Sequence, residues 1–151
     1  METDIILSDR VERFRILDFL WKAQRNATER NPDGSDNSPN IAKSLGIEKV
    51  RVETHLGTLN DRGFILISSR MTGGMIVKIV GKGTVFVEDF FLELERHVGK
   101  SDNAEIKNYV QKTEQENDTI MKHETLMQAM ITVQEVFRFG NNLLGKLGFG
   151  S

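Results

Sequence analysis

The segment from Pro39 to Ile65 constrains the fold more than any other part of the chain. Its spacing predicts a short helix, Ile41–Leu45, and a second helix, Glu48–Arg62, joined by a tight turn. Gly46 follows the first helix and Gly63 follows the second, and glycine readily adopts the positive φ that ends a helix. We therefore expect two helices that cross steeply through a tight turn.

The second helix of this pair has one apolar face. Val52, Leu56 and Leu59 recur at helical spacing, so they predict the side that packs inward. Ala42 is small enough for the two helices to approach closely, and Ile47 fills the space between them. These features together indicate a helix-turn-helix.

Patterns on either side extend this prediction. Asp9 and Glu12 have the spacing of a capping box and open a helix over residues 10–25. Residues 26–40 are polar and rich in turn formers, so we expect a surface loop. The runs 64–70 and 75–80, joined by a glycine turn, predict a β-hairpin. Another helix follows, with apolar residues at positions 87, 90, 94 and 98.

The C-terminal part differs in character. Residues 104–138 contain no Gly or Pro and follow an imperfect heptad spacing, which predicts one long helix able to form a dimer seam. The glycine-rich end, residues 139–151, is expected to fray. The predicted class is mainly α with a β-hairpin (α+β), with domains at 8–98 and 99–151.

The first of these domains resembles a known family. The pattern Leu45-Gly46-Ile47, the inward apolar face and the closing Gly63-Phe64-Ile65 match winged helix-turn-helix regulators of the prokaryotic and archaeal MarR-like and ArsR-like type. The hairpin resembles the wing, and the resemblance covers roughly residues 8–98. The long terminal helix is similar to that of archaeal members that dimerise through a C-terminal coiled coil. The resemblance implies a homodimeric transcription regulator that binds double-stranded DNA.

Charge is unevenly distributed along the chain. Between Lys43 and Lys82, seven basic and three acidic residues give a net charge of +4, whereas the whole chain carries −2. A local positive stretch suits an anionic partner such as DNA. The absence of cysteine excludes disulfides and cysteine-ligated metals and fits a reducing cytoplasm. No secretory signal or membrane span is expected, and no cofactor is called for.

The expected DNA contacts lie on the second helix of the pair and on the hairpin. Arg51 is the candidate for reading guanine, because its planar fork pairs with O6 and N7. The full predicted set is Lys43, Lys49, Val50, Arg51, Glu53, Thr54, Thr58, Arg70 and Lys78. Gly57 allows either close packing or close approach to a ligand, and packing is the preferred interpretation. His55 is interpreted as a semi-buried, hydrogen-bonded residue. His97 and His123 lack metal-site spacing, so solvated roles are expected.

Some features of the sequence also fit functions other than DNA regulation. The acidic total and the glutamates Glu48 and Glu53 also fit a non-enzymatic adaptor that binds another protein. A nucleoid protein would be more basic than this chain. No phosphate-binding glycine loop or catalytic triad pattern is present, which argues against an enzyme.

Overall fold

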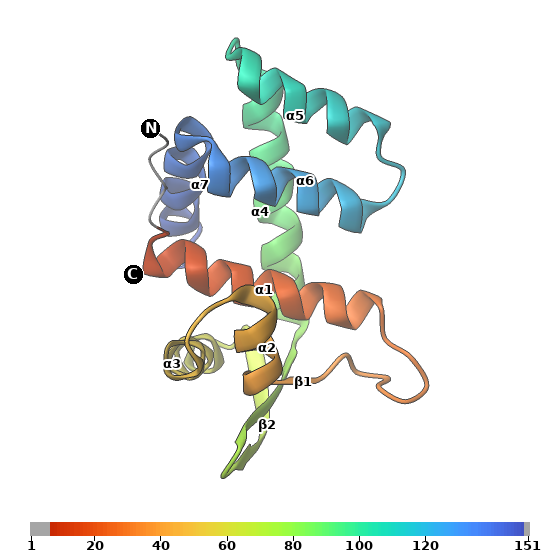
Figure 1. Cartoon of the computed structure of the whole chain (residues 1–151), viewed down its shortest axis with the longest axis vertical. Helices are drawn as coiled ribbons and strands as arrows, with labels where there is room; N and C mark the ends of the chain where they lie inside the picture. Colours follow the sequence, from red (N-terminus) through yellow and green to blue (C-terminus); the bar gives the residue numbers. More distant parts are fainter. Residues whose placement is uncertain (1–6, 150–151) are drawn as a thin grey trace. The chain divides into compact units, whose positions relative to one another are not determined.

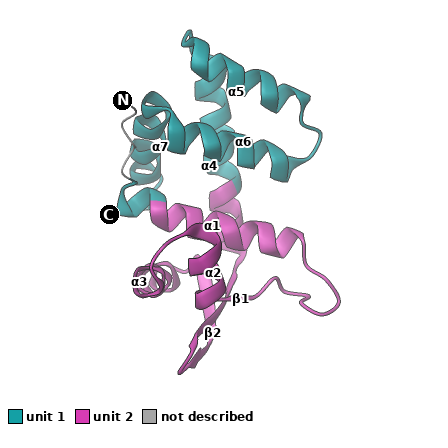
Figure 2. Cartoon of the chain, in the orientation of Figure 1, with its two compact units in different colours: residues 1–11, 88–151 teal, residues 12–87 magenta. Residues whose placement is uncertain are grey.

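The computed structural model describes residues 7–149 of the 151-residue chain (Figure 1). Within this range it contains seven helices and a three-stranded antiparallel sheet, so the α+β class is confirmed. The chain divides into two compact units, one of residues 12–87 and one of residues 1–11 with 88–151 (Figure 2). The element order of the 12–87 unit is compatible with a winged helix. None of the helices in the described range is long and apolar enough to cross a membrane.

Three helices open the chain: α1 (Asp9–Arg25), α2 (Ser38–Leu45) and α3 (Lys49–Asp61). The predicted first helix agrees closely with α1. The helix α2 begins three residues before the predicted start, because the Asn37 side chain accepts a hydrogen bond from the Asn40 amide and caps it. Gly46 (φ 67°) and Gly63 (φ 79°) adopt the left-handed conformations expected after α2 and α3.

The strands β2 (Ile65–Met71) and β3 (Gly74–Ile79) form the predicted hairpin, with a turn of only two residues. A third strand, β1 (Asp36–Asn37), pairs antiparallel with β3. The expectation of a surface loop throughout residues 26–40 is therefore wrong at β1. Two residues are too few to show the alternation of polar and apolar side chains that predicts a strand.

The core of the 12–87 unit lies among its helices and the hairpin. Val52, Leu56 and Leu59 are fully buried, which confirms the predicted inner face of α3. Phe86 lies in the first part of α4 (Gly81–Gly99), and its ring packs edge-on against Phe64 at a centroid distance of 5.0 Å. This core fixes α3 against the rest of the unit through one face only.

The other unit contains the rest of α4, followed by α5 (Ala104–Gln115), α6 (Thr119–Thr132) and α7 (Gln134–Lys146). The prediction of one long helix over 104–138 is therefore wrong. The first break precedes Asp118, whose side chain accepts from the Ile120 amide and starts α6. The second is at Val133, whose backbone is extended (φ −105°, ψ 115°). The described residues thus contain no continuous C-terminal helix for a coiled coil.

Apolar residues of this unit pack between consecutive helices. The fully or almost fully buried side chains include Ile106, Leu126, Met130, Val136, Leu144 and Phe149. The end of the chain, expected to fray, is helical through Lys146, and residues 150–151 lie outside the described range.

The two histidines of this unit stack on phenylalanines. His123 is buried and lies 4.1 Å from the Phe91 ring centroid, so the expected solvated role is wrong for it. His97 is partly exposed and stacks on Phe139 at 3.6 Å. Both rings therefore contribute to packing.

Candidate nucleic-acid interface

The nine residues predicted to contact DNA all lie on α2, α3 and the β2–β3 hairpin, which pack on one another (Figure 1). Six of them are exposed: Lys43, Lys49, Val50, Arg51, Thr54 and Arg70. Three are partly exposed: Glu53, Thr58 and Lys78. The structure thus brings the predicted set onto the surface of a single unit.

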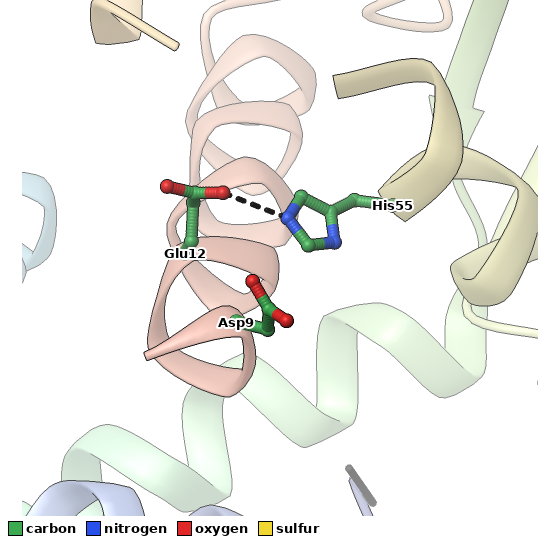
Figure 3. Close-up of side chains that lie close together, drawn as sticks. All are labelled: Asp9, Glu12 and His55. Atoms are coloured by element: carbon green, nitrogen blue, oxygen red, sulfur yellow. Dashed lines mark hydrogen bonds and ion pairs between the residues drawn. The ribbon is translucent and has the colours of Figure 1, made fainter. Parts of the chain in front are cut away.

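A buried glutamate of α1 anchors the first half of α3. The Nε2 atom of His55 lies 2.8 Å from Oε1 of Glu12, and both side chains are buried (Figure 3). The Nη2 atom of Arg51 lies 2.7 Å from the same Oε1 and donates to Oε2 at 2.8 Å. Because Arg51 and His55 are one helical turn apart, a single carboxylate fixes the rotation of α3 against α1.

Sequence reasoning missed this role of Glu12 and assigned its side chain to a capping box. The hydroxyl of Ser8 instead accepts from the Val11 amide at the start of α1. The contacts of Glu12 reach 39 and 43 residues along the chain, and no local pattern predicts such a distance. His55, in contrast, is hydrogen-bonded as predicted, and it is more deeply buried than expected.

The carboxylate of Glu12 and the imidazole of His55 are both groups that can bind a metal ion. The guanidinium of Arg51 lies on the same carboxylate, so its positive charge opposes a cation there. The arrangement is better suited to holding a helix than to holding a metal.

On the opposite flank of α3, Glu53 has an internal partner. The hydroxyl of Ser38, which is fully buried, donates to Oε2 of Glu53 at 2.8 Å and accepts from the Met75 amide at 2.9 Å. One serine thereby joins α2, α3 and β3. The Glu53 carboxylate, an unfavourable neighbour for phosphate, is held to the side of the helix by this bond.

The basic side chains between Lys43 and Lys82, the stretch with a net charge of +4, differ in their interaction partners. Lys82 donates to the Arg62 carbonyl at 2.8 Å, at the C-terminal end of α3. Lys78 lies 3.8 Å from Asp33. Lys43 and Lys49 are exposed and form no ion pair within residues 7–149. The last two are therefore the cations best placed to neutralise an external anion.

Asp33 is itself constrained by its own turn. The hydroxyl and the amide of Ser35 both donate to the Asp33 carboxylate, and these bonds, with Lys78, hold the pKa of Asp33 below its ordinary value. The Lys78 side chain is itself 34% exposed, so it retains access to solvent and to an external anion.

The centre of the outer face of α3 is uncharged. The hydroxyl of Thr54 donates to the Val50 carbonyl at 3.0 Å, and that of Thr58 donates to the Thr54 carbonyl at 3.3 Å. Gly57 lies on the same side, and a Cβ atom built there meets nothing within 4 Å. The interpretation of Gly57 as a packing position is therefore wrong, since no neighbouring element approaches it.

Comparison of the chain with protein-family models, with curated proteins and with solved structures gave no significant match.

Proposed function

We propose that this chain is a winged-helix transcription regulator that binds duplex DNA with α3 in the major groove and the β2–β3 hairpin on the backbone. The observation that carries the proposal is that α3 has one buried face and one exposed face. Its inner face is fully buried and fixed by Glu12, and its outer face is exposed beside Lys43 and Lys49, which form no ion pair with the described residues 7–149. A groove-reading helix needs a rigid base and a free outer face.

The charges of the unit support the same proposal. Lys43 precedes the turn between the two helices, and Lys49 is the first residue of α3. Arg70 is exposed in β2, near the turn of the hairpin. Cations at these places suit phosphate contacts that set the register of a helix on DNA. Arg51, which is half exposed and paired with Glu12, contributes positive charge at the edge of the groove.

Salt-dependent binding tests the proposal. Fluorescence anisotropy with a labelled random duplex, between 50 and 200 mM salt, gives the slope of log affinity against log salt, which reports the number of neutralised phosphates. The double variant Lys43→Ala/Lys49→Ala is expected to reduce the magnitude of this slope by about 2. The variant Lys107→Ala removes an exposed lysine of α5 and is the matched control. Absence of binding to any duplex at 50 mM salt would refute the proposal.

A dimer would address two half-sites about 34 Å apart. The three short C-terminal helices replace the coiled-coil seam expected from the sequence, so the stoichiometry is a separate question. Light scattering of the free protein and of its DNA complex measures it directly.

A second candidate function is protein binding through the same face. Val50 is 73% exposed on α3, and an exposed apolar side chain also suits a protein partner. Under this alternative, the chain fails to bind duplex DNA. It binds a defined protein partner that the variant Val50→Arg no longer retains.

A further inference from the structure

The outer face of α3 carries a stripe of three residues, Val50, Thr54 and Thr58, at successive i, i+4 positions. Val50 lies in the first turn and is 73% exposed, the highest value among the large exposed hydrophobic side chains of residues 7–149. The first turns of a groove-reading helix are the part that contacts base edges. The stripe therefore lies where the proposed function places sequence readout.

The threonines of the stripe present methyl groups rather than donors. Each hydroxyl proton is used in a bond to the carbonyl four residues earlier, from Thr54 to Val50 and from Thr58 to Thr54. This bond fixes χ1 and leaves the γ-methyl group on the other side of the side chain. Together with the isopropyl group of Val50, the stripe is an apolar surface that offers no hydrogen-bond donor of its own.

The charged residues beside the stripe are held by their own unit. Glu12 binds the Arg51 guanidinium on one flank, and Ser38 binds the Glu53 carboxylate on the other. Gly57 adds no side chain between them, so this part of the face is open to a close approach. The Arg51 and Glu53 side chains, which could read guanine and cytosine, thus have internal partners, and the methyl groups lie between them.

Thymine is the base that matches this surface. It is the only base that displays a methyl group in the major groove, and apolar side chains and threonine methyl groups are its usual contacts. Lys43 and Lys49 are exposed and supply positive charge that favours an anionic partner such as DNA. Resting on the proposed function, we infer that α3 recognises thymine C5-methyl groups through Val50 and Thr54, so that the preferred DNA site contains thymine at the centre of the contact.

The test removes the methyl group and nothing else. Duplexes selected by the wild-type protein from a random library are resynthesised with deoxyuridine in place of thymidine at each conserved position. Burial of one methyl group corresponds to about a fourfold change in affinity. We expect a loss of this size at each contacted position and no loss at thymidines outside the selected site.

Two variants assign the effect to the stripe. Val50→Ala is expected to abolish most of the discrimination between thymidine and deoxyuridine at the contacted positions. Val85→Ala makes the same change at another exposed valine, on α4, and is expected to keep the full discrimination. Circular dichroism of both variants verifies the fold.

The outcomes separate the inference from the proposed function. Binding with no difference between thymidine and deoxyuridine would overturn the inference and leave the DNA-binding proposal standing. Undiminished discrimination by Val50→Ala would overturn it as well. Failure of the wild-type protein to bind any duplex would overturn both.

Discussion

The variant Gly57→Ala is expected to make the protein more stable. Gly57 lies inside α3, where glycine is about 1 kcal/mol less favourable than alanine. The added Cβ meets nothing within 4 Å, so no steric cost offsets this gain. The free energy of unfolding should therefore rise by about 1 kcal/mol. For a chain of this length, the Tm should rise by about 2–4 °C.

A second helical glycine supplies the contrast. A Cβ at Gly83, in α4, would overlap the Phe64 carbonyl oxygen and lie 2.8 Å from the Ile79 side chain. The clash is with backbone, which cannot move aside as a flexible side chain can. Gly83→Ala should therefore lower the free energy of unfolding by more than the helix preference adds, with a net loss of roughly 1–3 kcal/mol.

Urea denaturation of the wild type and both variants, followed by circular dichroism, measures the two effects. The slope m should stay constant, so the change in midpoint reports stability alone. A fall in stability for Gly57→Ala would show that the α3 backbone or its surroundings differ from those described. Equal effects of the two substitutions would refute the distinction between an open and a crowded glycine.

Two further predictions concern other parts of the chain. Asp118→Ala removes the side chain that accepts from the Ile120 amide at the start of α6 and should lower the free energy of unfolding by about 1 kcal/mol. Asp102 is exposed and lies outside the helices, so Asp102→Ala is the control in urea denaturation, and equal effects of the two would contradict the capping role. Ser35→Ala removes the hydroxyl that lowers the pKa of Asp33, so an NMR titration should show that pKa rising toward its ordinary value. Because the pKa is lowered in the folded state, the contribution of Asp33 to stability is present at neutral pH and is lost as the pH falls through that pKa. An unchanged Asp33 titration in the variant would rule out the hydroxyl as the cause.

Sequence periodicity predicted the parts of the fold that depend on neighbours along the chain. Val52, Leu56 and Leu59 share one face of any helix, so their burial follows from their spacing. The positive φ of Gly46 and Gly63 likewise reflects a local preference of glycine.

The same periodicity was misleading over residues 104–138. Apolar residues keep 3- and 4-residue steps across the breaks before Asp118 and at Val133, because each of the separate helices also needs an inner face. The capping preference of Asp118 was the available local signal for the first break. A spacing pattern records which residues need burial and does not record where the chain changes direction.

At the candidate site, the Pro39–Ile65 segment combines features that depend on neighbouring residues with features that depend on distant ones. The two helices, their glycine ends and the buried face of α3 follow from its local sequence. The contacts of Glu12 with Arg51 and His55, and the open space at Gly57, follow from the fold. Helix formation and its inner face depend on contacts within a few residues. The engagement of a charged side chain depends on which distant residue the folded chain brings within hydrogen-bond reach.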